Sequence, residues 1–86
     1  MSEQFEGQVA IITGAASGLG LAIAKKLHAD GVRVAMLDLN QDAVQAASQE
    51  VGENAAAFPV DITDEAQADS CIAQIGQRFG RNFGGD

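Results

Sequence analysis

The sequence predicts an α/β fold in which three parallel strands, in the order 3-2-1, carry three helices. Three observations support this prediction. Short apolar runs alternate with segments of helical periodicity, a glycine stands where each of the first two helices should end, and a glycine-rich turn joins the first run to the first helix. Right-handed crossovers between parallel strands then place the third strand at an edge of the sheet.

The first strand is expected at residues 8–13, because the run VAII is of the short apolar kind that is buried on both faces of a parallel sheet. A helix should follow from Gly18 to about Asp30, ended by Gly31. Its predicted buried stripe consists of residues that recur every four positions, broadened by two alanines: Leu19, Ile23 and Leu27 with Ala22 and Ala24.

The second strand is expected at residues 32–38 and ends on Asp38. Asn40 is a suitable N-cap for a second helix over residues 41–51, which Gly52 should end. The buried face of that helix is predicted to carry Val44, Ala47 and Val51.

The third strand is expected at residues 55–60, and Pro59 within it favours a sheet edge because proline cannot donate to a ladder. A third helix should start after Thr63 or Asp64 and run to about Phe79. Its predicted buried face is Ala68, Cys71 or Ile72, Ile75 and Phe79. Residues 1–80 are therefore expected to form one domain, and residues 81–86 a glycine-rich tail.

Composition limits the function. The net charge of −7, without a basic cluster, argues against a nucleic-acid partner, and no apolar run reaches the ~20 residues that span a bilayer. The acidic, polar first residues are unlike a signal peptide, which favours the cytoplasm and no membrane partner. Cys71 is the only cysteine and His28 the only histidine, so the sequence predicts no internal disulfide and no metal site. We expect Cys71 to be a buried core residue and His28 to lie at the surface or to cap a helix.

The glycine-rich turn has the layout of a dinucleotide phosphate site, with a strand before it and a helix after it. Gly14 allows a tight turn with positive φ, Gly18 lets the backbone approach a pyrophosphate, and Gly20 lets the helix lie close to its strand. The helix N-terminus presents unpaired N–H groups and a positive dipole end to the phosphates, and Ser17 adds a hydroxyl. A plain strand-to-helix turn remains the alternative for these glycines alone.

Two aspartates are expected at the same carboxyl edge of the sheet. Asp38 follows Gly20 by 18 residues, close to the ~20 expected for the acidic residue that binds the adenosine ribose. Its carboxylate would repel a 2′-phosphate, so NAD is favoured over NADP. Asp61 ends the third strand, where its carboxylate could accept from the adenine amino group and the Ile62 N–H could donate to a ring nitrogen. A simple turn is the alternative for each aspartate, and it is a stronger alternative at Asp61 than at Asp38, because Asp38 is supported by the glycine turn upstream.

These residues together resemble the short-chain dehydrogenases/reductases. The segment TGAASGLG, residues 13–20, matches the TGxxxGxG turn of that family, Asp38 matches its NAD-preferring members, and Val60-Asp61-Ile62 is similar to its adenine-contacting segment. The resemblance covers roughly residues 8–81. It implies the N-terminal half of a Rossmann fold, an NAD cofactor, hydride transfer between NAD and an alcohol or ketone in the parent enzyme, and cofactor contacts from the residues of the turn, Gly14, Ser17, Gly18, Leu19 and Gly20.

The same resemblance points to a missing part. The family continues with a further strand, an Asn-Asn-Ala-Gly segment and a serine, tyrosine and lysine that perform catalysis, whereas these 86 residues contain no tyrosine and end with RNFGGD. We therefore assign no catalytic residue and expect this chain alone to be an inactive, truncated cofactor-binding half.

Two alternatives come from other classes. The chain would be a non-catalytic module that self-assembles if the uncovered edge of its first strand pairs with that of a second copy, giving a homo-oligomer with a parallel 3-2-1-1′-2′-3′ sheet. It would be a nucleotide-binding fold for a different adenosine ligand, such as a methyl donor, if the spacing to Asp38 served another cofactor. The TGxxxGxG form argues against this last alternative.

Overall fold

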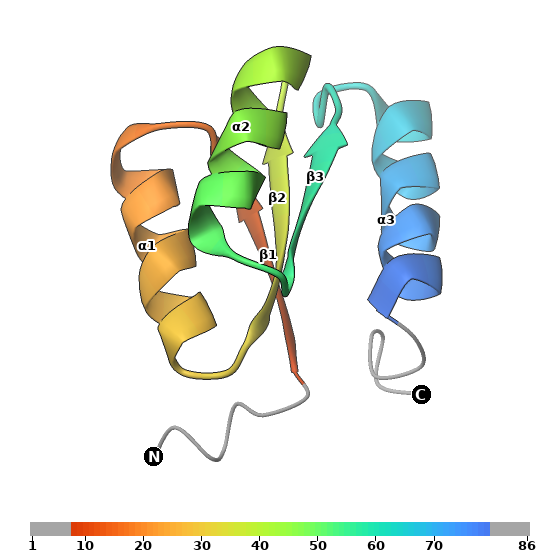
Figure 1. Cartoon of the computed structure of the whole chain (residues 1–86). Coiled ribbons are helices and arrows are strands. Elements are labelled where there is room, and N and C mark those ends of the chain that lie inside the picture. Colours follow the sequence, from red (N-terminus) through yellow and green to blue (C-terminus); the bar gives the residue numbers. More distant parts are fainter. Residues whose placement is uncertain (1–7, 80–86) are drawn as a thin grey trace.

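The computed structural model describes residues 8–79, which form alternating strands and helices. The strands are β1 (Val9–Thr13), β2 (Arg33–Asp38) and β3 (Ala55–Pro59), and the helices are α1 (Gly18–Ala29), α2 (Gln41–Val51) and α3 (Glu65–Phe79) (Figure 1). The predicted elements are therefore all present, with ends that agree within a residue or two. The predicted tail at residues 81–86 lies outside the described part.

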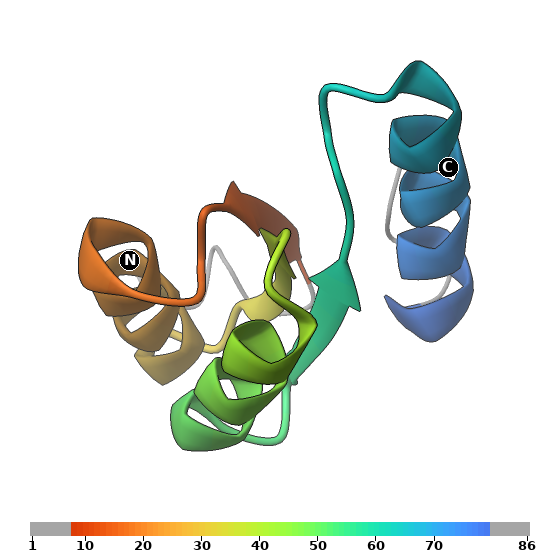
Figure 2. The ribbon, with the colours of Figure 1, turned by 90° about the horizontal axis from the view of Figure 1, so that it is seen from above.

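The three strands are parallel and β2 lies between β1 and β3, as predicted. Pro59 is the last residue of the edge strand β3, where its missing N–H interrupts no ladder. Helices α1 and α2 cover one face of the sheet and α3 covers the other (Figure 2). The molecule therefore has three layers, with β2 at the centre of the middle one.

Each face of the sheet has its own apolar core. Under α1 and α2, Val34 and Met36 of β2 pack with Ala24, Val44 and Ala47. Under α3, alternate residues of β2 and β3 pack with one face of the helix, namely Ala35, Leu37, Ala56 and Phe58 with Cys71, Ile75 and Phe79. The alternation of side chains along each strand divides the two sets between the faces.

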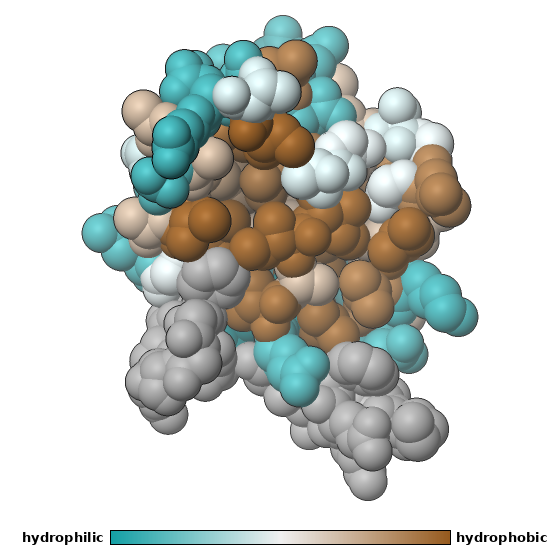
Figure 3. Space-filling view, turned by 180° about the vertical axis from the view of Figure 1, so that it is seen from behind, coloured by the Kyte–Doolittle hydropathy of each residue, from teal (hydrophilic) through white to brown (hydrophobic). Residues whose placement is uncertain are grey.

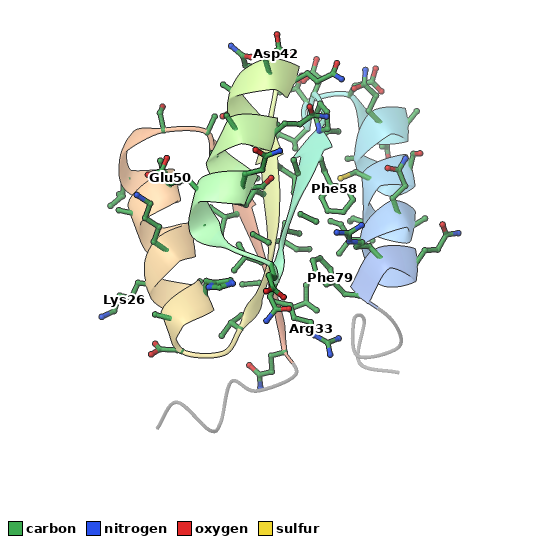
Figure 4. All side chains as sticks on the ribbon, viewed as in Figure 1. Lys26, Arg33, Asp42, Glu50, Phe58 and Phe79 are labelled. Carbon is green, nitrogen blue, oxygen red and sulfur yellow. The ribbon has the colours of Figure 1, made fainter. Side chains whose placement is uncertain are left out.

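Side-chain contacts fix the helices to one another and to the sheet. Phe58 and Phe79 point into the space between β3 and α3 (Figure 4), and the Arg33 guanidinium donates to the Phe79 carbonyl at 2.8 Å. On the other face, Lys25 of α1 forms an ion pair with Glu50 of α2. Lys25 and its neighbour Lys26 are both exposed, and Lys25 links the two helices.

The helix ends follow the predicted chemistry. The Asn40 side chain accepts from the Ala43 N–H at 3.0 Å and caps α2. Asp64 caps α3, because its Oδ1 accepts from the Gln67 N–H at 3.2 Å. Gly31 and Gly52 follow α1 and α2 with φ of 90° and 145°, so both helices end at residues that tolerate positive φ.

The predicted buried stripe of α1 is confirmed at Ala24 and Leu27 and is wrong at Leu19, Ala22 and Ile23. Leu19 is 77% exposed and Ile23 is 41% exposed, whereas Ala24 is fully buried and Leu21 and Leu27 pack beside it. The helix therefore presents Leu21, Ala24 and Leu27 to the sheet, and the close approach of Gly20 to the Gly14 carbonyl constrains its rotation. A four-residue repeat alone did not identify the inward face.

The prediction that β1 is buried on both faces is also wrong. Ile11 is 39% exposed, and the other residues of β1 are half-buried or exposed. The strand has a neighbour only at β2 within the described residues, and the core under α3 consists of β2, β3 and α3 residues, with only Val9 of β1 packed against it. The face opposite α1 and α2 therefore presents an apolar area to solvent (Figure 3).

His28 lies half-buried against the loop after α2 instead of on an open surface. Its Nε2 accepts from the Asn54 N–H at 3.3 Å, and a Cβ on Gly52 would lie 2.4 Å from the ring. The imidazole therefore forms a contact between α1 and this loop. None of the helices within residues 8–79 has the length and apolar character needed to cross a membrane.

Candidate functional site

The carboxyl ends of the three strands meet at one edge of the sheet, and a cleft lies there. Ligands bind along this edge in open parallel sheets. The cleft has a volume of about 250 Å³ and is lined by the ends of all three strands and the loops that follow them: Thr13, Gly14, Leu37, Asp38, Leu39, Val60, Asp61, Ile62 and Thr63. Residues from three distant parts of the sequence are thus brought together at one place.

The glycine turn between β1 and α1 has the backbone that its sequence predicts. Gly14 and Gly18 have φ of 62° and 61°, in the region that favours glycine. A Cβ on Gly20 would lie 2.4 Å from the Gly14 carbonyl oxygen, so only glycine lets α1 pack this close to the turn. At Gly18, by contrast, a Cβ would meet nothing within 4 Å, so the space beside this residue is open to a ligand.

The N–H groups of the turn divide into two sets. Ala15 donates to the Leu37 carbonyl at 3.1 Å and Ala16 donates to Asp38 Oδ2 at 3.2 Å, so both groups fix the turn to the end of β2. The first helical bond is from Leu21 to the Ser17 carbonyl. The N–H groups of residues 18–20 come before this first bond, so no carbonyl of the helix accepts from them. They lie at the positive end of the dipole of α1.

Ser17 is the N-cap residue of α1, but its side chain makes no capping hydrogen bond. A serine at this position ordinarily accepts from an N–H of the first turn. Its hydroxyl therefore makes no hydrogen bond to the helix. It lies at the same end of α1 as the N–H groups of residues 18–20. This donor set, together with the open space at Gly18, fits a pyrophosphate group.

Asp38 occupies the end of β2, half-buried, with both carboxylate oxygens engaged. Oδ2 accepts from Ala16 of the glycine turn and Oδ1 accepts from the Asn40 N–H at 3.1 Å. The carboxylate thereby connects the glycine turn to the cap of α2. Each carboxylate oxygen can accept a second hydrogen bond, so the group remains able to accept from ribose hydroxyls.

Asp61 lies across the cleft, in the loop between β3 and α3. Its Oδ1 accepts from the hydroxyl of Thr63 and from the Thr63 N–H at 3.0 Å. These two bonds, that of the hydroxyl above all, hold the pKa of the Asp61 carboxyl below its usual range. Ile62 is 48% exposed beside it, so this part of the cleft presents an ionised carboxylate and a large apolar side chain.

Leu19 in the first turn of α1 and Leu39 in the loop after β2 are exposed apolar side chains, at 77% and 73%. Leu39 lines the cleft, but sequence reasoning did not select it because a leucine in a short loop carries no chemical signal. Gln67 of α3 was missed too. Its Oε1 accepts from the Asp61 N–H at 3.0 Å, and the pattern Asp64-x-x-Gln67, which resembles a capping box, was the signal for it.

Cys71 lies away from this edge, in the core under α3, where burial raises the pKa of its thiol. This agrees with the predicted role as a core residue.

A larger groove of about 430 Å³ runs between α2 and β3 at the outer edge of the sheet, and it shares no residue with the cleft. The residues selected from the sequence for phosphate, ribose and base contacts all lie at the carboxyl edge.

The fold is an α/β arrangement of the Rossmann type, with a cleft at the carboxyl edge of its parallel sheet. The family model described as short chain dehydrogenase matches residues 8–82, and the chain therefore belongs to the short-chain dehydrogenase family. It is 40% identical over 77 residues to sorbitol dehydrogenase of Cereibacter sphaeroides, a match that covers 90% of this chain and 30% of that protein. It is also 40% identical over 76 residues to the human 3-hydroxyacyl-CoA dehydrogenase type-2, covering 88% of this chain and 29% of the relative.

Solved structures of two enzymes share the fold of this chain. A 3-ketoacyl-(acyl-carrier-protein) reductase from Brucella melitensis complexed with NADH matches with a TM-score of 0.85 and 35% identity, over 90% of this chain and 32% of the reductase. An NAD+-bound xylitol dehydrogenase matches with a TM-score of 0.84 and 32% identity, over 91% of this chain and 31% of that enzyme. The chain thus spans about 30% of the length of the relatives that it matches.

Proposed function

We propose that this chain binds NAD at the carboxyl edge of its sheet and forms the cofactor-binding part of a short-chain oxidoreductase. The observation that carries the proposal is the convergence of the glycine turn, Asp38 and Asp61 on one cleft. The matched structures that contain NADH or NAD+ share this fold over nine-tenths of the chain, which supports the cofactor class.

In this proposal the phosphates lie at the N-terminus of α1. The amides of Gly18, Leu19 and Gly20 donate to the pyrophosphate, and the uncapped Ser17 hydroxyl adds a donor. Gly14 contributes by holding the tight turn, and the Leu19 side chain covers the neighbouring ribose. Bound NAD would supply the hydride acceptor, while the protein supplies position and electrostatics.

The adenosine end lies between the two aspartates. Asp38 accepts from the ribose 2′ and 3′ hydroxyls without releasing Ala16 and Asn40, because each carboxylate oxygen has capacity for two bonds. Its negative charge opposes a 2′-phosphate, so the site prefers NAD to NADP. Both bonds from Thr63 go to Oδ1 of Asp61, which leaves Oδ2 for the adenine amino group, and the Ile62 N–H donates to a ring nitrogen.

Calorimetric titration of the 86-residue chain with NAD and NADP tests this proposal. We expect saturable NAD binding that is stronger than NADP binding, and Asp38→Ala should weaken NAD by at least about tenfold, because it removes two charge-assisted bonds and the anchor of the glycine turn. Asp42→Ala is the matched control, since Asp42 is an exposed carboxylate on the first turn of α2 (Figure 4). Equal effects of the two substitutions would contradict the role of Asp38.

We further propose that these 86 residues alone do not oxidise an alcohol or reduce a ketone. They contain no tyrosine, so the phenolic acid/base expected from the family resemblance is not among them. Steady NADH formation by the purified chain with an alcohol would contradict this proposal, whatever the result of the binding titration.

A second candidate function is self-association through β1. The Arg33 N–H bonds the Gln8 carbonyl, so the backbone groups of Val9, Ile11 and Thr13 point away from β2. With Ile11 partly exposed, this edge offers both hydrogen-bonding groups and apolar surface to a second copy. Sedimentation equilibrium should show a dimer that Ile11→Lys dissociates, and a monomer at high concentration would exclude this candidate.

A further inference from the structure

The side chain of Gln67 joins α3 to the loop that lines the cleft. Its Oε1 accepts from the Asp61 N–H at 3.0 Å, six residues earlier in the chain. Its Nε2 lies 3.4 Å from Asp64 Oδ2, and its own N–H donates to Asp64 Oδ1 at 3.2 Å. One amide side chain therefore connects the helix cap with the residue that begins the loop.

This arrangement differs from an ordinary capping box. There, the side chain three residues into the helix returns to the N–H of the N-cap residue itself. Here Gln67 reaches past its N-cap Asp64 to Asp61, whose carboxylate already accepts from Thr63. The contact consequently fixes the loop beside the cleft as well as the start of the helix.

The backbone explains why Asp61 needs this acceptor. The Asn54 carbonyl and the Val60 N–H bond to β2, so the even-numbered residues of β3 and its extension face β2. The next N–H, that of Asp61, points away from β2 because the direction alternates along a strand. No strand lies on that side within residues 8–79, and the Gln67 oxygen takes the place of a ladder partner.

The position of Gln67 on α3 brings its side chain close to the end of β3. It precedes Cys71, Ile75 and Phe79 at a spacing of four, so it lies on the face that packs against the sheet. Those three residues are buried, whereas Gln67 stands where this face passes the end of β3. An apolar residue at this point would extend the core but would leave the Asp61 N–H without its acceptor.

We propose that Gln67 is a positioning residue that orients the Asp61–Ile62 segment for adenine and so sets the preference for an adenine base over a 6-oxopurine. This inference rests on the proposed NAD site. Adenine presents a 6-amino donor to Asp61 and a ring acceptor to the Ile62 N–H. A hypoxanthine base presents an acceptor and a donor at these two positions, so both contacts become mismatched, and the discrimination depends on how well the segment is held.

Base selectivity is the readout that a purely structural role would not move. Dissociation constants of the 86-residue chain for NAD and for nicotinamide hypoxanthine dinucleotide should be measured for the wild type, Gln67→Ala and Gln67→Glu. Gln67→Ala should reduce the ratio of the two constants about threefold, the size of one exposed hydrogen bond. Gln67→Glu should restore the ratio in part, because it keeps the accepting oxygen but places a second carboxylate beside Asp64. Gln77→Ala, an exposed glutamine of the same helix, should leave the ratio unchanged.

A ligand-free measurement separates this inference from the proposed function. Hydrogen exchange of the Asp61 amide should be faster in Gln67→Ala than in the wild type and unchanged in Gln77→Ala. Equal exchange in all three proteins, or equal weakening of both dinucleotides by Gln67→Ala, would overturn the positioning role even if NAD binds. If the wild type does not bind NAD, the proposed function fails and base selectivity fails with it, while accelerated exchange would still establish the contact.

Discussion

The strands β1 and β2 are both short apolar runs, yet they differ in what surrounds them. Val34 to Met36 of β2 are fully buried and Leu37 is 6% exposed, whereas Ile11 of β1 is 39% exposed. β2 has a strand on each side and helices over both faces. β1 has one neighbouring strand within residues 8–79, and on the α3 side only its first residue, Val9, packs against the core, whereas Ile11 and Thr13 are exposed. Burial in this sheet thus follows from the neighbours of a strand rather than from its own composition.

The two regions also differ in whether their residues mainly stabilise the fold or line the cleft. The enclosed region around β2 holds both apolar cores, and the open region around β1 and the carboxyl edge holds the cleft. Leu39 and Ile62 of the cleft are exposed and contribute little to the cores, whereas Leu37 and Val60 line the cleft and belong to the core under α3. Substitutions in the enclosed region should therefore change the free energy of unfolding most, and those in the open region should change ligand binding with smaller effects on stability.

The largest effect is expected for Met36→Ala at the centre of β2. This side chain is fully buried, so its truncation should lower the free energy of unfolding by about 2–5 kcal/mol, which is most of the stability of a domain this small. Urea denaturation followed by circular dichroism measures the loss. Met36→Leu, which nearly conserves volume, should cost less than about 1.5 kcal/mol, and similar losses for both variants would contradict tight packing here.

Gly20→Ala should have the next largest effect, because its Cβ would lie 2.4 Å from the Gly14 carbonyl oxygen and α1 must shift. We expect a loss of about 1–3 kcal/mol together with weaker NAD binding. Gly18→Ala is the matched variant: its Cβ has open space, so only the positive φ should cost about 1–2 kcal/mol. Thermal unfolding and calorimetry on the same samples would show whether close packing or backbone conformation matters more in this turn.

Ile11→Thr tests the open side directly. Threonine keeps the β-branched shape, and the isoleucine is already partly exposed, so we expect a loss of about 1 kcal/mol or less. Urea denaturation at several protein concentrations provides the measurement. A loss as large as that of Met36→Ala would mean that this face of β1 is covered in solution, as it would be in a self-associated sheet.

The smallest effect concerns pH. Thr63 lowers the pKa of the exposed Asp61 carboxyl below its ordinary value of 3.8, so ionised Asp61 stabilises the fold above that value, and this contribution disappears as the pH falls through the lowered pKa. Unfolding of the wild type and Asp61→Asn should therefore differ slightly at neutral pH and converge in acid. Thr63→Ala should reduce the difference in free energy of unfolding between the wild type and Asp61→Asn. A difference that grew on acidification would contradict a stabilising role of ionised Asp61.

Much of the fold and the site could be predicted because it depends on local chemistry. Glycines at positions 14, 31 and 52 adopt positive φ, and Asn40 caps its helix through its own side chain. Pro59 lies at an edge because it lacks an N–H. Asp38 and Asp61 were placed correctly at one edge because parallel strands have their carboxyl ends together. Their chemical partners, Ala16 and Thr63, were not predicted.

What the sequence determined by itself was the order of elements, their ends, the glycine turn and the edge where polar residues gather, since each follows from backbone geometry over a few neighbouring residues. The tertiary structure alone decided which face of α1 points inward, how far β1 is covered and that Gln67 contacts Asp61. These features depend on how separate elements approach one another. A contact such as that of Gly20 with the Gly14 carbonyl constrains the rotation of a whole helix, and periodicity along one element does not contain that information.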